Sequence, residues 1–247
     1  MKIAVCISGQ PRSWQKGYMY LKKNLLVPYD GHVDVFYHAW IKHWDGTPYD
    51  LSFNREVLEM QNIIKAKRCD FNWGLEESGV FEKYNKKYTN TPDPVRFPPA
   101  NVMSAYKSML RASKLLSAEE KLHGPYDWVV RTRFDYALNG VLPFKDMDPT
   151  KLYIPHCRMV PERDFGNDQF AVGGSEVMHQ YMSTAQWIKE FYAAGVPMNG
   201  ELMMQATIRK FGLVGDRLVY MDMRNQFPPG KYNGSWHNLL RDDREQW

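Results

Sequence analysis

Cysteine is scarce in this sequence. Only three of the 247 residues are cysteines, at Cys6, Cys69 and Cys157. An odd number of widely spaced cysteines without a CxxC pair excludes a disulfide framework and a cysteine-based metal site. The pattern predicts a protein of a reducing compartment, and we expect it to be cytoplasmic.

Long apolar segments are also missing. No stretch approaches the roughly 18 apolar residues that a membrane-spanning helix requires. The apolar run near the start, Ile3 to Ile7, is too short for a signal peptide and predicts a buried first strand. We therefore expect no transmembrane segment.

Charge of one sign is not concentrated anywhere. Thirty-two Lys and Arg residues face 28 Asp and Glu residues, which gives a net charge of +4. This excess favours a small anionic ligand, but it is too weak and too dispersed to indicate nucleic acid binding. The short basic cluster at 65–68 predicts a solvated helix end. With 44% apolar and 24% charged residues, the composition is that of an ordinary globular domain.

Several enzyme signatures are absent as well. The sequence contains neither GxxxxGK[ST] nor GxGxxG, which argues against kinases, sulfotransferases and dinucleotide-dependent enzymes. It also lacks the glycine-rich loop of common methyltransferases, HExxH and GxSxG, so a metalloprotease or an α/β-hydrolase is not indicated. Another type of nucleotide-dependent transferase stays open as an alternative.

What the sequence does contain is an alternation of strand and helix patterns. A strand at 2–8, a turn at Gly9 and Pro11, a helix at 13–26 and a strand at 33–40 indicate a parallel α/β sheet. We predict further helices at 55–64, 101–123, 176–193 and 200–211, and further strands at 66–71, 128–135, 151–155 and 169–173. Residues 72–99 form a long irregular stretch. No repeat or linker divides the chain, so we expect one domain.

Polar residues follow the first predicted strand in the segment Ser8-Gly9-Gln10-Pro11-Arg12. Ligands of open α/β sheets bind beyond the carboxyl ends of the strands. Gly9 would let the backbone approach a ligand closely, and Arg12 could pair with a diphosphate or hydrogen-bond a base. A plain turn with a surface arginine is the alternative interpretation.

A second polar strand end carries Arg131, Arg133 and Asp135. Strand alternation would place the three side chains on one side of the chain. Burying them together is costly unless they pair with one another or meet a charged ligand. A diphosphate, alone or with a divalent metal, would suit this set. The alternative is an internal Arg–Asp salt-bridge network.

These two segments, together with Val33 to Trp40 and Asn167 to Gly173, occur in an order that resembles glycosyltransferases of the GT-A fold. The resemblance covers about residues 1–215 and includes poorly characterised members from polysaccharide loci and large DNA viruses. It implies a single α/β domain with a mixed, mostly parallel central sheet flanked by helices. Residues 1–135 would then form the nucleotide-sugar-binding half, and residues 136–247 the acceptor-binding half and C-terminal tail.

The resemblance also implies roles for individual residues. Asp135 matches the metal-binding end of the DxD motif of the fold, although Arg133 replaces the first acid and could itself neutralise phosphate charge. The implied cofactor is Mn²⁺ or Mg²⁺, with His237 similar to a C-terminal histidine that some such enzymes contribute to the metal. Asp168 is the expected catalytic base, which takes the acceptor proton. Glu162, Asp164 and Glu201 compete with Asp168 for this role.

Residues of the long predicted helix complete the candidate donor site. We place Asn101 and Ser104 in its first turn and Lys107 one turn later; a helix cap and a solvated face explain them equally. Aromatic side chains could stack on sugars or simply pack in the core. The donor-binding candidates are Ser8, Gly9, Gln10, Arg12, Asn101, Ser104, Lys107, Arg131, Arg133 and Asp135, and the stacking candidates are Trp40, Trp44, Trp73, Tyr88 and Trp236.

The combined pattern predicts an enzyme that transfers a sugar from a nucleoside diphosphate sugar, with UDP expected, to a glycan hydroxyl. We expect inversion at the anomeric carbon because a candidate carboxylate base is present. Its partners would be the nucleotide-sugar donor and the glycan acceptor, without nucleic acid. A non-catalytic carbohydrate-binding module is the alternative from another class. Such a module would have no need for Asp135 beside two arginines together with a second acid in a loop.

Overall fold

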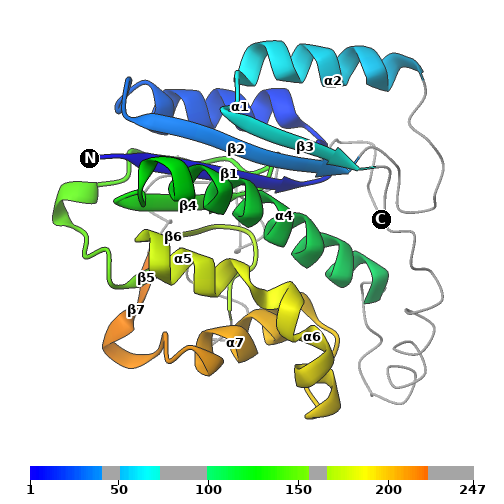
Figure 1. Ribbon diagram of the computed structural model, residues 1–247, viewed down its shortest axis with the longest axis vertical. Coiled ribbons are helices and arrows are strands. Elements are labelled where there is room, and N and C mark those ends of the chain that lie inside the picture. The colour runs from blue at the N-terminus through cyan, green and yellow to red at the C-terminus, as the bar shows by residue number, and fades with distance from the viewer. Residues whose placement is uncertain (41–50, 73–98, 156–165, 222–247) are drawn as a thin grey trace, which may run out of the picture.

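A computed structural model describes residues 1–40, 51–72, 99–155 and 166–221 of the chain, and only the backbone of 51–56 (Figure 1). Across these ranges seven strands form one sheet in the order β3-β2-β1-β4-β6-β5-β7. Only β6 (Ala171–Gly173) runs antiparallel to its neighbours, and the other paired strands are parallel. The fold is α/β, with a mixed, mostly parallel sheet in a single domain.

The first half of the sheet alternates strands and helices, as expected. Its elements are β1 (Ile3–Gly9), α1 (Trp14–Leu21), the π-helical turn η1 (Lys22–Leu26), β2 (Val33–Trp40), α2 (Leu51–Ile64) and β3 (Arg68–Asn72). β1 lies between β2 and β4 (Trp128–Thr132), and its side chains Ile3 to Ser8 are buried. A strand buried on both faces requires a continuous apolar run, which is the pattern that predicted β1.

The second half adds the remaining strands and most of the helices. Its elements are α4 (Pro99–His123), β4, η2 (Phe144–Asp146), β5 (Leu152–Pro155), β6, α5 (Ser175–Met182), α6 (Thr184–Ala193), α7 (Gly200–Lys210), η3 (Gly215–Arg217) and β7 (Leu218–Met221). β5 and β7 pair in parallel at the edge of the sheet beyond β6.

Two predicted elements differ from the structure, and one observed strand was not predicted. The strand predicted at 128–135 ends at Thr132, so strand alternation does not extend to Arg133 and Asp135. The single helix predicted at 176–193 is two helices, because the chain leaves α5 at Met182 and starts α6 at Thr184. The edge strand β7 was not predicted, since its apolar run is only four residues long.

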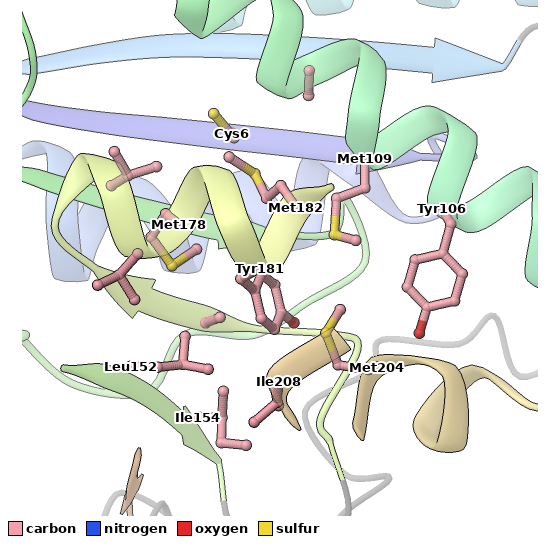
Figure 2. Packing of buried hydrophobic residues seen from close by; sticks show 14 of the residues in the cluster. Cys6, Tyr106, Met109, Leu152, Ile154, Met178, Tyr181, Met182, Met204 and Ile208 are labelled. Atoms are coloured by element: carbon pink, nitrogen blue, oxygen red, sulfur yellow. The ribbon is translucent and has the colours of Figure 1, made fainter. Parts of the chain in front are cut away.

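Two apolar layers cover the sheet. On one face, α4 to α7 pack against Cys6, Val129, Leu152 and Ile154 (Figure 2). On the other face, α1, α2 and the segment after β4 pack against Ile3, Val5, Ile7, Val130 and further apolar residues. The sheet is therefore the middle layer of three, and only its edges and strand ends are available to a ligand.

The helix α4 spans 25 residues and crosses the face of the sheet over β1, β2 and β3. Its buried side includes Val102, Tyr106, Met109 and Leu116, at the spacing that predicted the helix. The opposite side is polar. Among the described helices, none combines the length and the apolar character that a membrane crossing requires.

Gly17 of α1 lies where this helix meets the loop after β4. A Cβ atom built at Gly17 would lie 1.9 Å from the main-chain oxygen of Phe134. Alanine for glycine inside a helix normally stabilises by about 0.5–1 kcal/mol. We expect Gly17→Ala to lower the free energy of unfolding by about 1–3 kcal/mol instead, because the loop must move to admit the methyl group.

Urea denaturation measures this change. Gln15→Ala, at an exposed position of the same helix, is the matched control and should leave stability nearly unchanged. A Gly17→Ala variant that is as stable as the wild type would show that the close contact with Phe134 does not contribute to the free energy of unfolding.

Candidate functional site

The carboxyl ends of β1 and β4 form a topological switch point. From β1 the chain first builds β2 and β3 on one side and then crosses to β4 on the other side. β1 and β4 are paired in parallel, with Cys6 opposite Arg131 and Ile7 opposite Thr132. Open α/β sheets bind ligands in the crevice at such a point. The two polar segments predicted from the sequence, 8–12 and 131–135, therefore meet at the carboxyl ends of these two neighbouring strands.

The end of β1 and the turn after it contain four of the predicted donor-binding residues. Gly9 has a φ of +124°, a backbone conformation that favours glycine. Ser8 is buried, and its hydroxyl has no hydrogen-bond partner in the described ranges. Gln10 is half-buried and Arg12 is exposed. The end of β1 and its turn thus bring these residues to the switch point, and their role in donor binding stays a prediction.

Arg133 and Asp135 form a two-pronged ion pair. Arg133 Nε donates to Asp135 Oδ1, and Arg133 Nη2 donates to Asp135 Oδ2, each at 2.8 Å. The Asp135 side chain is 6% exposed and that of Arg133 is 28% exposed. Burial lowers the pKa of Arg133, but the Asp135 carboxylate outweighs this effect, and the pKa lies above its ordinary value. Each oxygen of Asp135 accepts one hydrogen bond from Arg133, so a metal at this carboxylate would compete with the positive charge of Arg133.

Arg131 lies deeper than Arg133 and has a different partner. Its side chain is buried on the face covered by α4 and α5, where its Nη1 donates to the main-chain oxygen of Asp168. Nε of Arg131 has no partner among the described residues. Burial lowers the pKa of this guanidinium from its ordinary value, although the nearby Asp168 carboxylate and two tyrosines oppose that effect. Arg131 contacts the loop of the predicted base rather than an opening to solvent.

Asp168 stands in the buried loop 166–170 that leads into β6. The side chain of Asn167 accepts hydrogen bonds from the backbone N–H groups of Gln169 (2.9 Å) and Phe170 (3.1 Å), which fixes the turn. The Asp168 carboxylate is half-buried beside Gly200, the first residue of α7; a Cβ atom built at Gly200 would lie 2.7 Å from Asp168 Oδ2. The positive end of the helix dipole stabilises a carboxylate at this place.

Glu201 is the second acid of the site. It follows Gly200 in the first turn of α7 and is half-buried. Burial raises the pKa of Glu201, and the Asp168 carboxylate raises it further. In the described part of the chain, neither acid has a hydrogen-bond or ion-pair partner for its carboxylate. From the sequence, Glu201 was a competing candidate for the catalytic base, with a plain first-turn acid as the alternative; its proximity to Asp168 arises from tertiary structure.

A network of polar side chains joins α4 to β2 and β3 near the carboxyl ends of these strands. His38 is fully buried, with Nδ1 2.6 Å from Ser108 Oγ and Nε2 2.9 Å from Asn72 Oδ1. Trp40 Nε1 donates to the main-chain oxygen of Ser104 at 3.1 Å. Sequence reasoning missed His38 and Ser108, since a histidine within an apolar strand gives no sign of its partners.

These contacts place the first half of α4 at the carboxyl end of β2. The predicted residues Asn101, Ser104 and Lys107 therefore lie near the candidate site, and all three are half-buried. Because α4 begins at Pro99, Asn101 is in its first turn as predicted, whereas Ser104 is in the second.

The described residues do not gather a metal site. No group of three or more His, Cys, Asp and Glu side chains within the described ranges is arranged to hold a metal ion. His237 lies outside the described residues, as do Glu162, Asp164 and the stacking candidates Trp44, Trp73, Tyr88 and Trp236. Mn²⁺ or Mg²⁺ binding by Asp135 thus stays a prediction.

A cavity of about 390 Å³ opens at the amino ends of β2 and β3, on the side of the sheet opposite to the candidate site. Its lining includes Asp34 and Lys67, which pair with each other at 2.9 Å. Ligands of parallel α/β sheets bind at the carboxyl ends of strands. We therefore place the candidate site at the carboxyl ends of the strands, where the Asp168 and Glu201 carboxylates have no ion-pair partner among the described residues.

No protein-family model matches the sequence, and no curated protein matches it. The interpretation of the site consequently depends on its geometry and on the sequence patterns described above.

His38 predicts a pH dependence of stability. Burial lowers the pKa of His38 to about 4, although the hydrogen bond with Asn72 opposes this effect. The unfolded chain, with a histidine pKa of about 6.5, binds more protons between these two values. Stability should therefore fall as the pH drops from about 6.5 to 4, by up to about 3 kcal/mol from this residue.

Urea denaturation at pH 7 and pH 4.5 tests this contribution. His38→Gln keeps a hydrogen-bonding side chain and every carboxylate but cannot titrate, so it should lose less stability between the two pH values than the wild type. Equal losses in both proteins would show that His38 titrates normally.

Proposed function

We propose that this protein is a glycosyltransferase that uses a nucleoside diphosphate sugar as donor, with UDP as the expected nucleotide. The observation that carries the proposal is the meeting of Arg133, Asp135 and the Asp168–Glu201 acids at the switch point of the sheet. A mixed, mostly parallel sheet flanked by helices is also what the GT-A resemblance implies. Cations for a diphosphate and a carboxylate for an acceptor hydroxyl are the groups that sugar transfer needs.

Arg133 is the residue suited to the donor diphosphate. It is partly exposed, whereas Arg131 is buried under the Asp168 loop. A guanidinium binds phosphate oxygens in the same forked geometry with which it binds a carboxylate. In the proposed complex, Arg133 exchanges one or both of its Asp135 contacts for phosphate oxygens. The described residues gather no group of three or more metal-binding side chains, so every step below is assigned to residues of this chain.

Asp168 is the proposed general base. The acceptor hydroxyl oxygen forms a bond to the anomeric carbon from the face opposite the leaving group, and its proton passes to the Asp168 carboxylate. The bond between that carbon and the β-phosphate oxygen breaks, and its electron pair leaves with the nucleoside diphosphate. Arg133 stabilises the negative charge that develops on the leaving group.

The nucleotide class can be tested by thermal shift with UDP, GDP and CMP, with and without Mn²⁺, followed by a donor-hydrolysis screen over nucleotide sugars. A nucleoside diphosphate should raise the melting temperature. A protein that responds only to free glycans would be a carbohydrate-binding module, and the proposal would be wrong.

Asp168→Asn should retain donor binding and lose most transfer, because the amide cannot accept the acceptor proton. General-base catalysis contributes about 10²–10⁴-fold, so we expect a loss of that order in kcat. Asp216→Asn, at an exposed position of η3, removes the same charge and is the control. Near wild-type turnover by Asp168→Asn would identify another residue, such as Glu201, as the base.

Arg133 and Asp135 should have opposite effects on nucleotide binding without a metal. Arg133→Gln removes the cation and should weaken UDP binding about tenfold or more, whereas Asp135→Asn releases Arg133 and should leave the affinity unchanged or increase it. Calorimetric titration of UDP in the presence of EDTA measures both. If Asp135→Asn weakens binding only when Mn²⁺ is present, Asp135 is a metal ligand, as the resemblance implies.

A further inference from the structure

Three buried side chains donate hydrogen bonds to main-chain oxygens beside the two acids. Tyr181 Oη of α5 donates to the oxygen of Asn167 at 2.6 Å. Arg131 of β4 donates to the oxygen of Asp168, and Tyr106 Oη of α4 donates to the oxygen of Gly200. We call Tyr106, Arg131 and Tyr181 the anchoring residues. They come from three separate elements and contact both chain segments that carry the acids.

Residues 166–170 form a loop, and Gly200 begins α7. The buried carbonyls of Asn167 and Asp168 lie outside regular structure and require donors from elsewhere in the molecule. The carbonyl of Gly200 is a normal helical acceptor, and the hydroxyl of Tyr106 is an additional donor to it. Each anchoring residue is at most 3% exposed, so water does not compete for these hydrogen bonds.

The anchored positions bracket the acid pair. Asp168, which follows Asn167, carries one carboxylate. Glu201, which follows Gly200, carries the other. Figure 2 shows Tyr106 extending from α4 toward α7, and Tyr181 lying between α5 and the strands below it. Because these donors are fixed by the packed core, they fix the relative position of two acids that are 33 residues apart in sequence.

Arg131 also places a positive charge close to Asp168. Its guanidinium lies close enough to Asp168 for the carboxylate to favour the charged form of the arginine. Arg131 thus opposes the mutual repulsion of Asp168 and Glu201 from the buried side of the loop. Both acids are half-buried, whereas Arg131 is buried.

We propose that Tyr106, Arg131 and Tyr181 are positioning residues that set the geometry of the Asp168–Glu201 pair for the acceptor, and that Arg131 is not a ligand of the donor diphosphate. The inference rests on the proposed function for its catalytic consequence. It changes the role expected for Arg131, which the sequence placed in the donor site with Arg133.

The test uses Tyr106→Phe and Tyr181→Phe, which remove one hydroxyl each and keep the packing of the ring. Tyr29→Phe is the matched control: Tyr29 Oη also donates to a main-chain oxygen, that of Leu142, at 2.5 Å, outside the candidate site. Three properties are measured in each protein: the affinity for UDP, the kcat and KM of transfer with the best donor of the screen, and the titration of the Asp168 and Glu201 carboxyl groups by NMR.

Both anchoring variants should bind UDP as the wild type does and lose about tenfold or more in kcat, since small displacements of a catalytic group are costly. The midpoint of the Glu201 titration should shift in both variants and stay unchanged in Tyr29→Phe. Arg131→Lys should likewise keep the UDP affinity, whereas Arg133→Lys should reduce it.

The outcomes separate the two proposals. A wild-type protein without nucleotide affinity or donor hydrolysis would overturn the proposed function, while a Glu201 titration that shifts only in the anchoring variants would still support their positioning role. A titration and kcat in Tyr106→Phe and Tyr181→Phe equal to those of Tyr29→Phe would overturn the inference. A loss of UDP affinity in Arg131→Lys that matches Arg133→Lys would show that Arg131 binds the diphosphate.

Discussion

The hydrogen bond from Arg131 to the main-chain oxygen of Asp168 joins the centre of the sheet to its candidate catalytic loop. β4 lies between the parallel strand β1 and the antiparallel strand β6, so Arg131 stands at the junction of the two halves of the sheet. A buried guanidinium is stable there only if its donors find acceptors and its charge finds a counter-charge. The loop carbonyl accepts a hydrogen bond from Nη1, and the Asp168 carboxylate supplies the nearby counter-charge. The buried charge of Arg131 therefore favours the observed position of the Asp168 loop.

The acidic side chains at the amino ends of the strands and those at the carboxyl ends differ in their partners. At the amino edge the charges are paired: Glu119 contacts Lys67 (3.1 Å) and Arg68 (2.8 Å), and Glu120 accepts hydrogen bonds from Ser175 and contacts His179. At the carboxyl ends, Arg133 and Asp135 also form an ion pair, but the carboxylates of Asp168 and Glu201 have no hydrogen-bond or ion-pair partner among the described side chains. Half-buried acids with a raised pKa, such as Glu201, are typical of functional sites. These two acids, rather than the size of a cavity, mark the candidate site.

Much of the fold could be predicted from the sequence because its signals are local. The apolar run of β1, the aromatic and branched residues of β2 and the periodic face of α4 each determine an element within a short window. Boundaries were less predictable: the apolar pattern of β4 gave no sign that the strand stops at Thr132. The alternation argument for Arg133 and Asp135 was therefore wrong, although the two residues do lie together through their ion pair.

The site was predictable only as far as its residues cluster along the chain. The segments 8–12 and 131–135 follow strands that become neighbours, so their meeting followed from the α/β pattern. The partnership of Asp168 with Gly200 and Glu201, and the donors Tyr106 and Tyr181, depend on how α4, α5 and α7 pack. No short-range pattern encodes those contacts, and a tyrosine in an amphipathic helix predicts a core residue whether or not its hydroxyl is used.

The contact of Gly17 with Phe134 has a mechanical consequence. α1 directly follows the turn that contains Gly9 and Arg12, and Phe134 stands between the two members of the Arg133–Asp135 ion pair. Because no side chain separates the helix from this loop, a shift of either one would press directly on the main chain of the other. In the proposed complex, a ligand that displaced the turn after β1 would therefore also act on the Arg133–Asp135 loop.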